Sequence, residues 1–150
     1  MKFVFEAQGI EQASRRFNRM GAAAIDLAPV WEEILQYFFY IEDATFQSQG
    51  RRGGGSWAQD SDEWLARKAR EGLDPRINFA TWALYDSMTL EGAPGQVVEI
   101  TPDALRFGSD LPQAGPSQRY RAFIKLTVED RQVMAKLIGE YFLLAWEAAV

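Results

Sequence analysis

The chain has 150 residues, with 16 Lys plus Arg against 21 Asp plus Glu, so its net charge is −5, and it contains neither cysteine nor histidine. A hydrophobic fraction of 47% and a charged fraction of 25% are typical of a globular protein, and the length predicts one domain over residues 1–150. The two missing residue types exclude disulfides, thiol nucleophiles, thiolate or imidazole metal sites and His-dependent triads. We therefore expect a protein that is not an enzyme and uses no cofactor or metal ion.

The N-terminal residues predict a short strand followed by a helix. Apolar and polar residues alternate over 2–7, and apolar residues recur at helical spacing over 10–24. Glu6 interrupts the apolar region that a signal peptide needs, and the longest apolar runs are much shorter than the ~20 residues that cross a bilayer. These features predict a protein of the cytoplasm with no membrane partner.

A long helix is predicted from about residue 28 or 30 to 46 or 48, and it is apolar over most of its circumference. Trp31, Leu35 and Phe39 form one apolar stripe beside a second stripe that begins at Val30. A helix of this kind is buried on more than one side. We therefore predict that Trp31, Leu35 and Phe39 meet another subunit. The alternative is a core helix enclosed entirely by its own domain.

The segment 49–56 contains three consecutive glycines and two arginines, which predicts a flexible loop. Arg51 and Arg52, with Trp57 nearby, form a candidate contact site, either to a nucleic-acid backbone with base stacking or to acidic patches on a protein partner. The second interpretation is favoured, because the net charge of −5 opposes phosphate binding. The loop that contains this segment is predicted near 49–60, and two more loops are predicted near 91–96 and 108–118.

The rest of the chain predicts a mixed fold. Helices are expected after the capping residue Ser61 and from 128 onward, the second with an apolar inner stripe that packs as core. A short helix or a turn-rich segment is expected around 81–87. A β-hairpin is expected around a turn at 101–104, and alternation over 120–126 predicts a last strand. The expected fold class is α+β. It has a small antiparallel sheet of about four strands against a long helix and a C-terminal helix, with a glycine-rich loop.

Several short segments follow one another in a characteristic order. They are GGGSW at 53–57, ARKAR at 66–70 with Gly72, DPRI at 74–77, TWALYDSMT at 81–89, FGSDLPQA at 107–114 and RAFIKLTVEDR at 121–131. In this order they resemble the virion-morphogenesis (tail-completion) proteins of long-tailed bacteriophages, over roughly residues 46–142. Three segments depart from the family pattern. Trp82 stands where the family usually has glycine, Ala122 stands where it usually has proline, and the tyrosine and histidine often found after Phe-Gly-Ser are replaced, with Gln113 near the position of the first.

The resemblance implies a structural protein of the phage neck that is assembled in the host cytoplasm and resides in the virion. It implies a homo-oligomeric ring of about six copies that completes the tail end and allows head–tail joining, with connector, tail-tube or terminator proteins as neighbours and DNA passing through the lumen. A tail terminator capping the tube is an alternative within the same class. From other classes come a DNA-contacting module that uses Arg51, Arg52 and Trp57, and a carboxylate-dependent hydrolase that would need a divalent metal ion.

Overall fold

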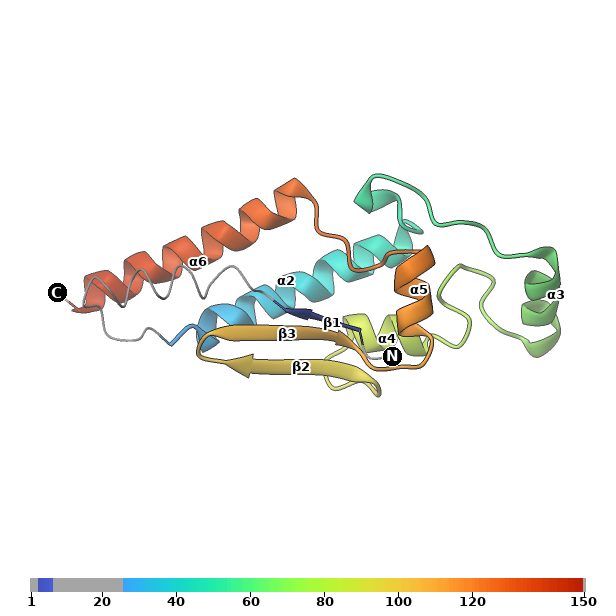
Figure 1. Cartoon of the computed structure of the whole chain (residues 1–150), viewed down its shortest axis with the longest axis horizontal. Coiled ribbons are helices and arrows are strands. Elements are labelled where there is room, and N and C mark those ends of the chain that lie inside the picture. The colour runs from blue at the N-terminus through green and yellow to red at the C-terminus, as the bar shows by residue number, and fades with distance from the viewer. Residues whose placement is uncertain (1–2, 7–25, 150) are drawn as a thin grey trace. The chain divides into compact units, whose positions relative to one another are not determined.

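A computed structural model describes residues 3–6 and 26–149, and this part of the chain contains three β-strands and five α-helices. The helix predicted over 10–24 lies outside the described residues. In chain order the elements are β1 (Phe3–Glu6), α2 (Ala28–Gln47), the 3-10 helix η1 (Arg51–Gly53), α3 (Asp62–Glu71), α4 (Ala83–Thr89), β2 (Gln96–Thr101), β3 (Ala104–Ser109), α5 (Ala114–Tyr120) and α6 (Val128–Ala149) (Figure 1).

The chain divides into two compact units, each assembled from separate stretches of sequence. We call them the first unit and the second unit. The first unit consists of Met1–Val4, Phe38–Val97 and Gly108–Lys125, and the second unit consists of Phe5–Tyr37, Val98–Phe107 and Leu126–Val150.

The helix ends follow the capping residues that the sequence supplies. The Ser61 side chain accepts a hydrogen bond from the Trp64 backbone N–H at 3.2 Å, and α3 ends at Gly72 in the left-handed conformation. At the start of α6, Thr127 and Asp130 bond each other reciprocally, with the Thr127 N–H donating to Asp130 Oδ2 at 2.8 Å and the Asp130 N–H to Thr127 Oγ1 at 3.1 Å. The predicted α3, α6 and long helix α2 are all confirmed.

The described sheet has three strands in the order β1-β3-β2, so β3 is hydrogen-bonded on both sides. The predicted hairpin is confirmed as β2 and β3, which lie side by side in Figure 1. The inner stripe of α6 differs from the expectation. Met134, Leu137 and Ile138 are half-buried rather than core residues.

The strand predicted over 120–126 is wrong, and the sheet therefore lacks the fourth strand within the described residues. Helix α5 continues to Tyr120, and the next residues form no regular element. Side chains bond several of their backbone groups instead of a neighbouring strand. Gln118 Oε1 accepts from the N–H groups of Phe123 and Ile124, and Gln118 Nε2 donates to the Ile124 carbonyl. This local bonding replaces the strand pairing that the alternating pattern predicted.

The core of the first unit is a cluster of aromatic rings around Phe46, which is fully buried. The Phe46 ring centre lies 5.3 Å from that of Trp57, 5.7 Å from Phe79, 5.6 Å from Tyr85 and 5.8 Å from Phe123. Three of these ring pairs meet edge to face, which is the favoured geometry for aromatic rings. Burial raises the pKa of Tyr85, and the hydrogen bond that its hydroxyl donates to Asp43 raises it further.

The glycine-rich segment forms a bonded turn rather than the expected flexible loop. Residues Arg51–Gly53 are a 3-10 helix, the Gly50 N–H donates to the Thr45 carbonyl at 2.9 Å, and the Trp57 N–H donates to the Gln49 carbonyl at 3.0 Å. Gly50 has a φ of 84°, and a Cβ added there would lie 2.4 Å from Trp57 Cδ1. The glycine therefore permits both the turn and the inward position of the Trp57 ring.

Gly50→Ala is expected to destabilise the protein more than Gly54→Ala, by about 1–3 kcal/mol beyond the cost of a left-handed alanine. The two glycines are a matched pair, because Gly54 has a φ of 83° but no atom within 4 Å of its added Cβ. Urea unfolding of both variants measures the difference. Equal losses would mean that the close approach of Trp57 to Gly50 does not exist in solution.

Candidate functional site

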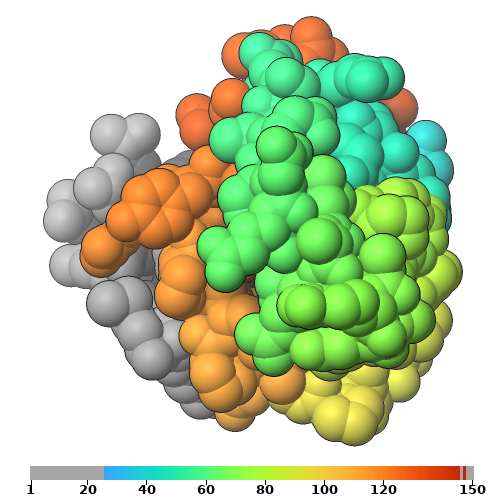
Figure 2. Space-filling model, turned by 90° about the vertical axis from the view of Figure 1, so that its right-hand side faces the viewer, coloured from blue at the N-terminus to red at the C-terminus, as the bar shows by residue number. Residues whose placement is uncertain are grey.

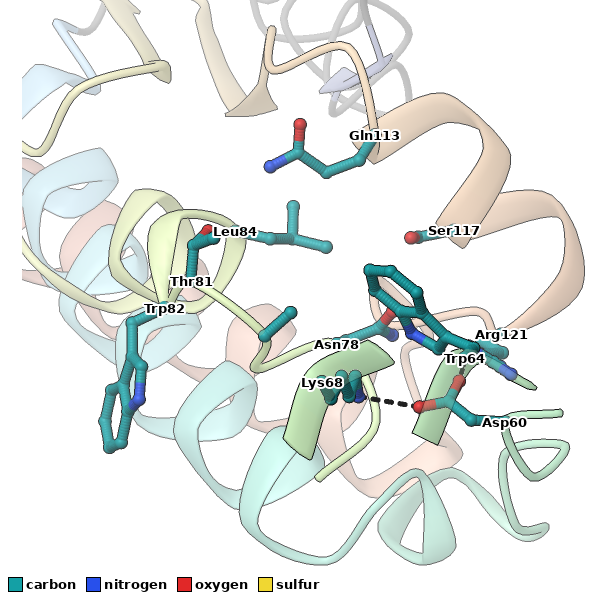
Figure 3. Close-up of a pocket in the computed structure, with 11 residues that line it drawn as sticks. Asp60, Trp64, Lys68, Asn78, Thr81, Trp82, Leu84, Gln113, Ser117 and Arg121 are labelled. Carbon is teal, nitrogen blue, oxygen red and sulfur yellow. Dashed lines mark hydrogen bonds and ion pairs between the residues drawn. The ribbon is translucent and has the colours of Figure 1, made fainter. Parts of the chain in front are cut away.

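The first unit contains a pocket of about 180 Å³ between α3, the segment before α4, and α5 (Figure 3). In Figure 2 the green atoms around α3 and the orange atoms around α5 lie on the same face of the molecule. The pocket is lined by Asp60, Trp64, Lys68, Asn78, Ala80, Thr81, Trp82, Leu84, Gln113, Ser117 and Arg121.

One wall of the pocket is a charged triad of Asp60, Lys68 and Arg121. Lys68 Nζ lies 2.6 Å from Asp60 Oδ2, and the side chains of both residues are 2% exposed. Arg121 Nη1 lies 2.8 Å from Asp60 Oδ1, so the two carboxylate oxygens each have a cationic partner. The attraction of the two cations offsets part of the cost of removing this carboxylate from water. The triad carries a net charge of +1, from two positive groups and one negative group.

Helices α3 and α5, together with hydrogen bonds to backbone carbonyls, hold the two cations of this triad in place. Lys68 lies on α3, whose start is capped by Ser61, and its ammonium also donates to the Arg76 carbonyl at 2.8 Å. Arg121 follows α5 directly, and its Nη2 donates to the Gln59 carbonyl at 3.1 Å. Lys68, from the neighbouring helix, and Arg121, from a distant part of the sequence, therefore converge on one buried carboxylate, Asp60.

Asn78 lines the pocket with an amide group that lacks a partner. Its Nδ2 atom is buried and makes no hydrogen bond. Its φ is 63°, in the left-handed region that asparagine tolerates better than most residues. An unmade hydrogen bond of a buried donor costs about 1–3 kcal/mol, so such a group in a folded protein requires an explanation.

The other side chains give the pocket polar and apolar walls. In Figure 3 the Gln113 amide and the Ser117 hydroxyl, both from the α5 region, point into the space above Leu84. The Trp64 ring forms another side of the same space, whereas the Trp82 ring points away from it. The arrangement offers hydrogen-bond donors and a net positive charge next to flat apolar surface.

Beside the pocket, Arg76 connects an ion pair with an aromatic stack. Its guanidinium carbon lies 3.8 Å from the ring centre of Phe79 and 5.0 Å from that of Trp82. Its Nη2 lies 2.8 Å from Asp74 Oδ2. The hydrogen bond from the Arg76 side chain lowers the pKa of Asp74 below its ordinary value of 3.8.

Trp82 has a left-handed backbone conformation, which glycine adopts more easily than other residues. It has a φ of 66° and precedes α4, and its side chain is 42% exposed. A non-glycine residue in this region is strained by roughly 1–2 kcal/mol. Trp82, where the sequence departs from the resembled pattern, thus adopts a backbone conformation that glycine adopts without strain.

The Asp74–Arg76 pair is expected to make stability fall in acid. Because the folded state lowers the pKa of Asp74, the ionised carboxylate stabilises the fold above pH 3.8, and this contribution is lost as the pH falls through the folded-state pKa. Carbon NMR of the Asp74 carboxyl group measures that pKa. Arg76→Gln is expected to move it back toward 3.8, and an unchanged value in that variant would contradict the assigned cause.

None of the six residues predicted as contact residues lines this pocket. Trp31, Leu35 and Phe39 are 1%, 6% and 9% exposed, as the alternative of an enclosed core helix predicts. They offer no open surface to a second subunit in this conformation, because the chain itself covers both apolar stripes of α2.

The predicted nucleic-acid contact is also changed by the structure. Trp57 is 6% exposed, and its Nε1 donates to the Ala122 carbonyl at 3.1 Å, so the ring cannot stack on a base. Arg51 is exposed and Arg52 is half-buried. Arg51 and Arg52 therefore stay candidate residues for a phosphate contact, but Trp57 cannot supply the predicted base stacking.

Among residues 3–6 and 26–149, no group of three or more carboxylate, histidine or cysteine side chains gathers as a metal site. Of the helices described, none combines the length and apolar character needed to cross a membrane. No protein-family model, curated protein or solved structure matches the chain.

Proposed function

We propose that the chain is a structural protein of the neck of a long-tailed bacteriophage. In this proposal copies of the chain assemble in the host cytoplasm into a ring of about six subunits at the head–tail joint. The ring completes the tail end and makes it competent for joining. The proposal depends on the resemblance of the segments between residues 46 and 142 to the tail-completion proteins.

The observation that carries the proposal is that these segments contact one another in the first unit. Lys68, from the segment 66–70, donates to the backbone carbonyl of Arg76, from the segment 74–77. Trp57, from the segment 53–57, donates to the carbonyl of Ala122, from the segment 121–131. Four of the six segments that carry the resemblance are therefore joined by hydrogen bonds within this unit. Such a pattern favours a shared framework and a structural role over a shared reaction.

The charge of the chain is compatible with DNA passing through such a ring. Six copies at −5 would carry a net charge of about −30. An acidic lumen repels phosphates, so DNA would pass without being retained. A basic lining of the assembled ring would contradict this part of the proposal.

Inactivating the gene in the phage that carries it tests the proposed role. We expect the lysate to contain filled heads and separate tails, visible by negative-stain electron microscopy, and we expect joined particles to return when the chain is supplied from a plasmid. Tails of uncontrolled length would instead identify the chain as a tail terminator. Normal joined particles would overturn both assignments.

A further inference from the structure

The pocket beside the Asp60–Lys68–Arg121 triad has unused donors and no uncompensated anionic side chain. Its one anionic lining residue, Asp60, already accepts bonds from both cations at 2.6 and 2.8 Å. Arg121 has five N–H groups, of which the bonds to Asp60 and Gln59 use two. The Asn78 Nδ2 atom, which is also a donor, has no partner.

The charge and the walls of the pocket restrict the chemistry of a ligand. A net charge of +1 matches a singly charged anion. The Trp64 ring and Leu84 supply an apolar wall that a hydrated inorganic anion does not use. A carboxylate group on a short apolar stem carries the single negative charge and also places apolar atoms against the Trp64 ring and Leu84.

The size of the pocket limits the ligand to a small group. At about 180 Å³ it is smaller than the roughly 300–1,000 Å³ of pockets that take whole drug-sized molecules. A short carboxylate-bearing chain is of the right scale, whereas a nucleotide is not. Residues of α3 and α5 line the pocket, and the atoms around both helices lie on one face in Figure 2, so such a group enters from solvent or from another protein.

We propose that this pocket binds a carboxylate group, which donors of Asn78 and Arg121 hold while Trp64 and Leu84 contact its apolar stem. A free small carboxylic acid and a glutamate or aspartate side chain share this chemistry. The inference does not depend on the neck assignment, because it follows from the polar groups and charge of the first unit alone.

Nitrogen-15 NMR of the side-chain amides in the full-length protein tests the proposal. The probes are acetate, glutamate capped at both ends, the equally capped glutamine and inorganic phosphate. We expect capped glutamate to shift the Asn78 amide signal saturably and to bind at least about tenfold more tightly than capped glutamine, because charged hydrogen bonds are about twice as strong as neutral ones. Saturation by acetate as well points to a free carboxylate, and saturation by capped glutamate alone points to a protein side chain.

The decisive variant is Asn78→Asp, which keeps the size of the side chain and its tolerance of positive φ while it replaces a donor with a negative charge. We expect it to weaken capped glutamate binding at least about tenfold, followed by the amide signal of the lining residue Gln113, because the variant has no amide at position 78. Gln132→Glu adds the same charge at an exposed position outside the pocket and should leave binding unchanged. If Asn78→Asp fails to fold, Gln113→Glu places the charge on the opposite wall and is expected to weaken binding in the same direction.

Three results would overturn the proposal. The first is the absence of a saturable shift with either carboxylate. The second is equal binding of capped glutamine or tighter binding of phosphate, which would remove the argument from charge and shape. The third is unchanged binding in a folded Asn78→Asp or Gln113→Glu variant.

Discussion

Lys68→Met is expected to lower the free energy of unfolding by about 3–5 kcal/mol. Methionine approximates the length of lysine, so packing is largely kept and the loss reports on charge and hydrogen bonds. The variant removes the buried ammonium that contacts Asp60 at 2.6 Å, and it leaves the Arg76 carbonyl without the donor it has at 2.8 Å. Urea unfolding followed by circular dichroism measures the change.

The matched control is Lys136→Met on α6, where the lysine side chain is 75% exposed and its ion pair with Glu140 spans 3.6 Å. That exchange is expected to change stability by no more than about 0.5 kcal/mol. A loss below about 1 kcal/mol for Lys68→Met would show that the triad is not a buried structural element. The wall of the proposed pocket would then lack its support.

Phe46→Ala is expected to cost about 3–5 kcal/mol of stability. The ring is fully buried and touches the rings of Trp57, Phe79, Tyr85 and Phe123, so its removal leaves a cavity at the centre of the first unit. The same unfolding experiment measures the loss, and near-ultraviolet circular dichroism reports on the aromatic packing.

Tyr40→Ala is the control for this variant, because Tyr40 also lies on α2 but is 67% exposed. Its loss is expected to be much smaller, since most of the ring remains in water in the native state. Similar losses for the two variants would contradict the placement of the core on the Phe46 side of α2.

The sequence predicted those helices whose ends are fixed by hydrogen bonds between residues close to one another in the chain. Ser61 and Gly72 bound α3, and Thr127 with Asp130 starts α6. Each of these caps bonds backbone groups close by in sequence, so no tertiary information is needed. The hairpin of β2 and β3 was predictable for the same reason.

Features that depend on distant contacts could not be predicted in this way. The alternation after Tyr120 is typical of a strand, but the Gln118 side chain bonds the backbone there and no strand forms. The two stripes of α2 indicated burial on more than one side, but not whether the cover came from another subunit or from the chain itself. The structure shows Trp31 covered by its own chain.

The candidate site shows the same limit. The residue types of Asp60 and Lys68 give no sign of burial, and only the fold shows that both are buried as a pair. One signal was available, because Lys68 follows Trp64 by four residues and therefore shares its face of α3. Arg121 and Asn78 gave no comparable signal, since loops far apart in sequence bring them to the pocket.

The measurement that tests the central claim most directly is an electron-microscopic reconstruction of the intact particle at side-chain detail. The account predicts a ring of copies of this chain at the joint between head and tail, in which residues 38–97 and 108–125 keep the Asp60–Lys68–Arg121 triad. Purified infectious particles in which this chain is absent from the neck would contradict it.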